Sequence, residues 1–136
     1  MGLKERRVVK NFQDTKFPEI RKSIDGAAGF EVEMDIDWDS LSEDDMGHMF
    51  DENIPQVYFE PLILAFQKIC IDDMGKEALK AGLKKVVIRN QSGNYYPDSA
   101  ISFTGGVLTI DHLPNSNVGD VKARADKIED IISRSL

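Results

Sequence analysis

The sequence predicts an α+β fold of two layers, with helices covering one face of a mainly antiparallel sheet of about four strands. Three observations predict this fold. Residues 30–39 alternate apolar and acidic side chains, which is the period of a half-buried strand. A glycine pair inside 100–111 separates two β-rich runs, as in a hairpin. Apolar residues recur every three to four positions over 18–29, 61–70 and 120–133, which indicates amphipathic helices.

The length of 136 residues fits one domain, which we expect to comprise residues 14–136 after a partly ordered basic arm over 1–13. A chain of this size buries about two thirds of its unfolded surface, so its stability requires no disulfide or metal. The single Cys70 cannot form an internal disulfide and is expected to be a reduced core thiol. No apolar run reaches the roughly 18–20 residues of a membrane helix, which favours a cytoplasmic location and no membrane partner.

The first helix is predicted from Pro18, because proline is favoured at the first helical position, to a stop at Gly29. Ser42 followed by Asp45 is typical of a capped helix start, so 43–50 should be a short helix or turn, and 51–55 a loop. A helix begins again near Pro61 and runs to about residue 70 as a central, broadly apolar element.

The second half of the chain predicts another helix, three strands and a terminal helix. Asp72 or Asp73 can cap a helix that runs through Leu83, and 85–89 is a short β-branched strand. A two-residue turn at 105–106 would pair Thr104 with Val107, Phe103 with Leu108 and Ile101 with Ile110, so these three strands should form a meander. In the terminal helix, Asp120 with Arg124 and Lys122 with Asp126 have ion-pair spacing.

The charge is unevenly distributed along the chain. The net charge is −7, yet residues 31–60 contain eleven Asp or Glu and no Lys or Arg. Such a block creates a local negative potential that attracts cations or a basic partner and repels the phosphates of nucleic acids. We therefore expect a basic protein partner and no nucleic acid, although a solvated strand face alone would explain the same pattern. The position of the acidic strand, central or at an edge of the sheet, is left open.

No catalytic residue, metal site or cofactor site is predicted. The Cα atoms of neighbouring acidic residues on one strand face are about 6.5–7 Å apart, too far for two carboxylates to share a proton. Starting from Asp35, the calcium-loop pattern fails, because its sixth and twelfth positions are Ser40 and Met46. His48 and His112 have no second histidine or cysteine at zinc-ligand spacing and are expected in surface or turn positions.

Aromatic residues provide a second group of candidate contacts. Tyr58, Phe59, Tyr95 and Tyr96 are expected in loops or at the ends of elements, where exposed rings can anchor a partner. Two adjacent tyrosines in a turn cannot easily both be buried. The alternative to a binding role is a loop that folds one ring onto the sheet. The predicted partner-binding residues are therefore Glu31, Glu33, Asp35, Asp37, Asp39, Tyr95 and Tyr96.

These features favour a non-enzymatic binding module whose acidic surface over 31–60 engages a basic partner, similar in character to an inhibitor or immunity protein. One alternative is a small enzyme or ligand-binding domain with a discontinuous site, for example from Asp39, His48 and Tyr58. Another is a structural subunit of a homo-oligomer. The sequence does not predict the oligomeric state.

Overall fold

The computed structural model describes residues 2–136 and shows a mixed α/β fold around a four-stranded sheet. The strands lie in the order β1-β2-β4-β3, with bounds β1 (Met34–Ile36), β2 (Lys85–Arg89), β3 (Ile101–Thr104) and β4 (Val107–Asp111). β1, β2 and β4 are parallel, and β3 is antiparallel to β4. The prediction of a mainly antiparallel sheet is therefore wrong, while the combination of helices with one sheet is confirmed.

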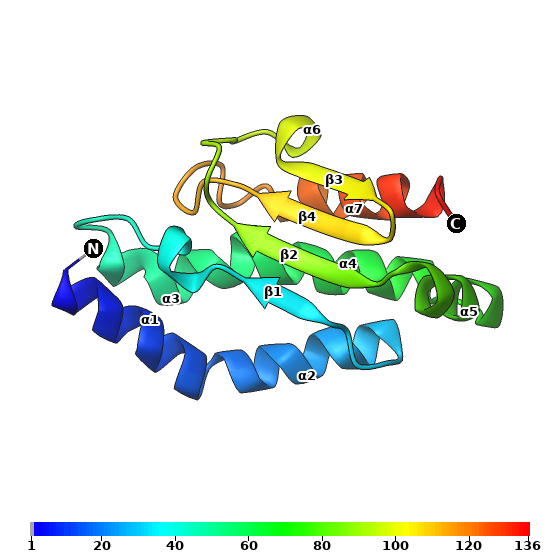
Figure 1. Cartoon of the computed structure of the whole chain (residues 1–136), viewed down its shortest axis with the longest axis horizontal. Coiled ribbons are helices and arrows are strands. Elements are labelled where there is room, and N and C mark those ends of the chain that lie inside the picture. Colours follow the sequence, from blue (N-terminus) through cyan, green and yellow to red (C-terminus); the bar gives the residue numbers. More distant parts are fainter. Residues whose placement is uncertain (1) are drawn as a thin grey trace.

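Helices form the second layer of the molecule. Their bounds are α1 (Leu3–Thr15), α2 (Phe17–Ala28), α3 (Phe50–Ile54), α4 (Glu60–Ile69), α5 (Asp73–Gly82), α6 (Pro97–Ala100) and α7 (Val121–Ser133). Figure 1 shows α4 and α7 behind the strands, with no helix in front of β1 and β2. Side chains that point to the helices, such as Val86, Ile88, Leu108 and Ile110, are fully or almost fully buried, which places the core between the layers.

The hairpin has the predicted register, but the meander is wrong. Thr104 pairs with Val107, Phe103 with Leu108 and Ile101 with Ile110. However, β4 lies directly beside β2, so β3 occupies the far edge of the sheet. The segment between β2 and β3 crosses the end of β4, to which it is bound: the Leu113 N–H donates to the carbonyl of Asn94 at 2.8 Å. This crossing carries the chain to the far edge, and β4 then returns between β3 and β2.

The acidic strand is an edge strand and is shorter than predicted. β1 covers only residues 34–36, although Val32 is fully buried and Glu33 and Asp35 are exposed, in the predicted alternation. Before β1, side chains of α2 bind the backbone of Val32. After it, Trp38 begins a 3₁₀ turn, η1 (Trp38–Leu41), and its ring packs against Phe17. Helical side chains therefore hold the segments on either side of β1, in addition to its hydrogen bonds with β2.

Residues 3–13, which we expected to belong to a partly ordered arm, lie in helix α1; Met1 is outside the described residues. Val9 and Phe12 of α1 are buried in the core. The Phe12 ring meets Phe50 edge to face at 5.3 Å between centroids and Trp38 at 5.8 Å. Such aromatic pairs each add about 0.5–1.5 kcal/mol beyond burial, so these contacts fix α1 to the domain.

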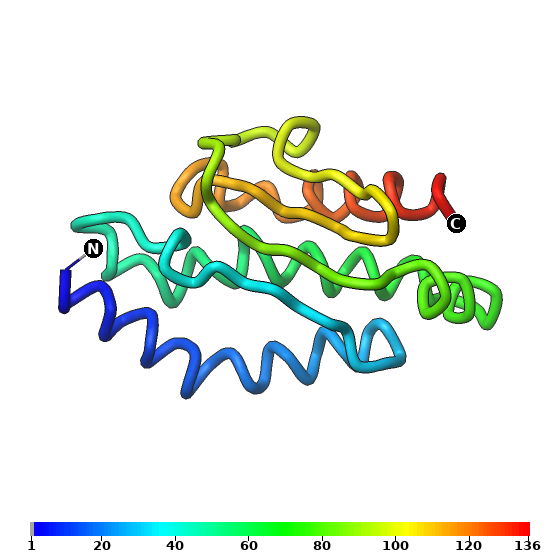
Figure 2. The backbone as a smooth tube through the Cα atoms, viewed as in Figure 1, coloured from blue at the N-terminus to red at the C-terminus, as the bar shows by residue number. Residues whose placement is uncertain are grey.

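The loop predicted over 51–55 is wrong, because α3, the π-helical segment η3 (Pro55–Phe59) and α4 form one continuous helical run. In η3 the N–H of Glu60 donates to the carbonyl of Pro55, five residues earlier. Pro61 cannot donate and its ring crowds the preceding turn, and a π turn relieves this conflict without ending the helix. The backbone tube in Figure 2 follows this run along the molecule.

Helices α2, α5 and α7 agree with the sequence, whereas the short helix α6 was not predicted. α2 and α7 begin and end close to their predicted limits, and Asp72 caps α5 by accepting the Gly75 N–H at 2.8 Å. Lys122 pairs with Asp126 at 2.6 Å. The predicted ion pair between Asp120 and Arg124 does not form, because Arg124 turns into the core. Within residues 2–136, no helix combines the length and the apolar character needed to cross a bilayer.

Candidate functional site

The candidate site is the acidic edge, which we define as Glu31, Glu33, Asp35, Asp37 and Asp39. All five side chains are exposed. The first four follow the backbone alternation onto the open face of the sheet, whereas Asp39 lies in the turn η1. Among residues 2–136, no ion pair involves any of these carboxylates. The exposure of these side chains agrees with the alternation in the sequence.

Strand β2 supplies the immediate neighbours of the acidic edge. The parallel register pairs Asp35 with Val87, and its continuation sets Glu33 beside Lys85 and Asp37 beside Arg89. Neither basic side chain reaches the neighbouring carboxylate. A shallow hollow of about 400 Å³ lies at this point, lined by Asp35, Asp37, Val87, Ile88, Arg89 and Gln91.

The turn after β2 is tied to the acidic edge. Gln91 Nε2 donates to Asp37 Oδ2 at 3.1 Å, and the Asn90 N–H donates to the Ser40 hydroxyl at 3.0 Å. Sequence reasoning did not include this turn among the site residues. Its only signal was the polar composition of 90–94, which is typical of any loop.

Asp111 holds the same turn from the other side. Its nearly buried carboxylate accepts from Arg89 Nε at 3.0 Å, from the Gln91 N–H at 2.9 Å, and from the Ser92 N–H and hydroxyl, each at 3.1 Å. Burial by itself would raise the pKa of Asp111, but these hydrogen bonds lower it below its ordinary value. The carboxylate is therefore ionised at neutral pH and fixes the end of β2.

Tyr95 and Tyr96 are both exposed, with 48% and 60% of their surface accessible and ring centroids 4.5 Å apart. They precede α6 on the β3 side of the sheet, whereas the acidic edge is at β1, the opposite edge. Asn117 Nδ2 fixes their loop by donating to the Tyr95 carbonyl at 2.7 Å. The structure therefore separates the two predicted groups of partner-binding residues.

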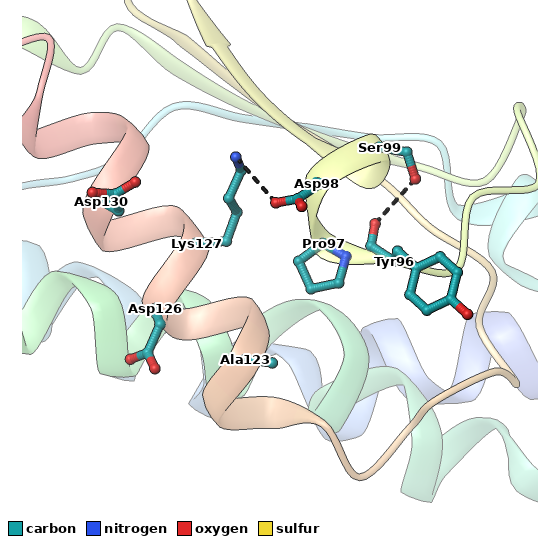
Figure 3. Close-up of a pocket in the computed structure, with 8 residues that line it drawn as sticks. All are labelled: Tyr96, Pro97, Asp98, Ser99, Ala123, Asp126, Lys127 and Asp130. Atoms are coloured by element: carbon teal, nitrogen blue, oxygen red, sulfur yellow. Dashed lines mark hydrogen bonds and ion pairs between the residues drawn. The ribbon is translucent and has the colours of Figure 1, made fainter.

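Tyr96 borders a groove of about 690 Å³ between α6 and α7 (Figure 3). Its walls are Tyr96, Pro97, Asp98 and Ser99 from α6 and its N-cap, and Ala123, Asp126, Lys127 and Asp130 from α7. Lys127 spans the groove to Asp98, with 3.4 Å between Nζ and Oδ1. This volume is within the range of ligand sites, but the groove is open to solvent and its surface is mainly apolar. Its one cation, Lys127, is already paired with Asp98.

Tyr58, Phe59 and His112 are not surface residues, contrary to the predictions. All three side chains are fully buried, and the Tyr58 hydroxyl donates to the His112 carbonyl. Burial raises the pKa of Tyr58 far above its ordinary value. A discontinuous site made from Asp39, His48 and Tyr58 therefore lacks an accessible tyrosine.

The His112 ring has one hydrogen bond and one unpartnered nitrogen. Nδ1 lies 2.6 Å from the carbonyl of Leu113, which can only accept, so the neutral ring carries its proton on Nδ1. Nε2 is buried and has no hydrogen-bond partner among the described residues. Burial lowers the pKa of His112, the bond to Leu113 partly offsets this, and the charge of Arg124 lowers the pKa further.

We expect acid to destabilise the protein through His112. Because its folded pKa lies below the ordinary 6.5, the unfolded chain binds this proton first as the pH falls below about 6.5. The free energy of unfolding should then decrease by up to about 1.4 kcal/mol per pH unit for one such group. Urea titrations from pH 7.5 to 5.5 measure this slope. His112→Asn should reduce it and His48→Asn, on the surface, should retain it; an equal slope in both variants contradicts the assignment.

No group of three or more His, Cys, Asp or Glu side chains within residues 2–136 is arranged to hold a metal ion. Comparisons of the chain with protein-family models, curated proteins and solved structures give no match.

Proposed function

We propose that this protein is a non-enzymatic binding module whose acidic edge engages a basic surface of a partner protein, in the manner of an inhibitor or immunity protein. One observation carries the proposal: no carboxylate of the 31–60 block forms an ion pair within residues 2–136. Outside the block, ion pairs take up seven carboxylates, namely Asp14, Glu19, Asp25, Asp98, Asp111, Asp126 and Asp130.

This contrast matters because concentrated, unpaired charge does not stabilise a domain. Carboxylates along one strand repel one another, and within residues 2–136 no Lys or Arg forms an ion pair with them to offset that repulsion. A basic partner would offset it and would be attracted over a long range, which increases the association rate and rejects acidic partners. The neighbouring Lys85 and Arg89 do not pair with the acidic edge, so its carboxylates are accessible to a partner. Nucleic acid is disfavoured at this surface because its phosphates are repelled.

The test replaces Asp35, Asp37 and Asp39 together by asparagine, which removes charge with little change in shape. A control variant, Asp73→Asn with Glu77→Gln and Glu129→Gln, removes three carboxylates outside the block that form no ion pairs. Wild-type protein should capture a basic protein from a lysate of the cells that produce it at low salt and release it at high salt. For that partner, we expect the association rate of the first variant to fall about tenfold or more.

The control variant should associate within about twofold of wild type, since long-range attraction depends on where the charge lies. Equal association rates for the two variants would overturn the role of the acidic edge. If nothing salt-sensitive is captured, the groove between α6 and α7 becomes the candidate site, as a ligand-binding domain would require.

A further inference from the structure

The outer side of β1 has backbone groups without partners. In a strand, successive residues direct their N–H and C=O groups to opposite sides. Glu33 and Asp37 point theirs toward β2: the Val86 N–H donates to the Glu33 carbonyl, and the Asp37 N–H to the Ile88 carbonyl, both at 2.9 Å. Met34 and Ile36 therefore point outward, and among residues 2–136 no hydrogen bond reaches their backbone groups from that side.

Helix α2 closes this edge at only one residue. Asp25 Oδ1 accepts the Val32 N–H at 2.9 Å, and an Arg21 guanidinium N–H donates to the Val32 carbonyl. These two side chains supply the hydrogen bonds that a neighbouring strand would make to Val32, and they bind no later residue of this edge. A hollow of about 400 Å³ lies beside the edge, lined by Arg21, Glu31, Val32, Glu33 and Met34. The free edge continues over β1 for about 10 Å, to the turn at Trp38.

From these observations we infer that β1 binds an extended segment of the basic partner as an added, fifth strand of the sheet. The inference rests on the proposed function and assigns the mode in which the partner binds. The outward groups of Met34 and Ile36 supply the hydrogen bonds. Side chains of the added strand on the open face lie about 4.5–5.5 Å from those of β1, so Lys or Arg at alternate positions stands opposite Glu33, Asp35 and Asp37.

The other face of the added strand favours apolar residues. Met34 and Ile36 are half-buried and pack against the core, so the side chains of the added strand beside them face the helix layer. The segment therefore alternates basic and apolar residues. A second copy of this chain does not fit, because pairing β1 with β1 would set carboxylates opposite carboxylates. The other edge strand, β3, carries the uncharged Ser102 and Thr104 on its open face and offers no such complementarity.

A capped synthetic peptide that alternates lysine and valine provides the probe. Two derivatives carry backbone N-methyl groups, one on every valine and the other on every lysine, which removes alternate N–H donors and leaves the charge unchanged. In an antiparallel pairing the valines direct their N–H groups to β1, and in a parallel pairing the lysines do so. Strand addition therefore predicts that one derivative binds at least about tenfold more weakly than the parent peptide and the other binds like it.

Titration of ¹⁵N-labelled protein at low salt gives both affinity and location. The amides of Met34 and Ile36 should become protected from exchange, and those of β3 should not change. If both derivatives bind like the parent, or if protection appears at β3 instead, strand addition at β1 is overturned while charge-driven binding stands. If the parent peptide binds the triple asparagine variant as well as wild type, the proposed function fails too.

Discussion

Replacing Arg124 by alanine should lower the free energy of unfolding by about 3–5 kcal/mol. Arg124 is 1% exposed and forms no ion pair with a carboxylate among residues 2–136. Instead, Nη1 donates to the carbonyl of Asn117 at 2.7 Å, and Nη2 to those of Val118 at 2.7 Å and Gln56 at 3.1 Å. Arg124 thus joins η3 to the loop before α7. Its removal leaves a cavity and takes the arginine donor from three carbonyls, of which that of Asn117 keeps the Asp120 N–H as a second donor.

The control is Lys122→Ala on the same helix, where the lysine and its ion pair with Asp126 are exposed to solvent, so the substitution should change the stability little. Urea unfolding of wild type, Arg124→Ala and Lys122→Ala gives the free energies of unfolding to be compared. Arg124→Lys should recover only part of the loss, because one ammonium cannot reach three carbonyls fixed by a planar fork. A loss below about 1 kcal/mol for Arg124→Ala would show that the carbonyls find other donors.

The features that were predictable from the sequence depend on neighbours close in the chain. The hairpin register follows from Gly105 and Gly106, whose positive φ values of 60° and 82° form the two-residue turn. The cap at Asp72 likewise involves a residue three positions away. The alternation at 30–39 predicted which carboxylates would be exposed, because burial of one strand face determines the other.

The features that were not predictable arise from contacts between distant segments. Nothing near β2 indicates that β4 lies beside it, since that order depends on the path that Asp111 and Asn94 impose on the crossing segment. Arg124 was predicted to pair with Asp120 four residues earlier, which is the local optimum for a helix surface. The packing of η3 against the loop before α7 creates a buried acceptor site, and this tertiary contact outweighs the local pair.

The candidate site divides in the same way. Exposure of the acidic edge followed from the sequence, whereas its place at the rim of the sheet, and hence the unpartnered backbone of Met34 and Ile36, did not. Edge and central strands with one apolar face share the same alternation, so only strand order distinguishes them.

Replacing Asp111 by alanine should lower the free energy of unfolding by about 3–4 kcal/mol. The change removes four hydrogen bonds and leaves the N–H groups of Gln91 and Ser92 without an acceptor. Arg89 loses its ion pair, although its half-exposed side chain can be solvated instead. Amide exchange at Gln91 and Ser92 should accelerate because their N–H groups lose their acceptor. The hollow beside the acidic edge should also become less ordered, because Gln91 of this turn donates a hydrogen bond to Asp37.

Asp98→Ala is the matched control, since Asp98 also forms one ion pair but is 92% exposed, and it should change the stability by less than about 1 kcal/mol. Asp111→Asn tests the role of charge, because an amide oxygen can still accept from the Gln91 and Ser92 N–H groups but no longer attracts Arg89. The decrease in the free energy of unfolding for Asp111→Asn should fall between the decreases for Asp98→Ala and Asp111→Ala. The pKa of Asp111 is lowered in the folded protein, so its contribution exists above about pH 4 and is lost as the pH falls through the folded pKa. Equal stability of Asp111→Ala and wild type at pH 7 would contradict the assignment of Asp111 as the residue that fixes this turn.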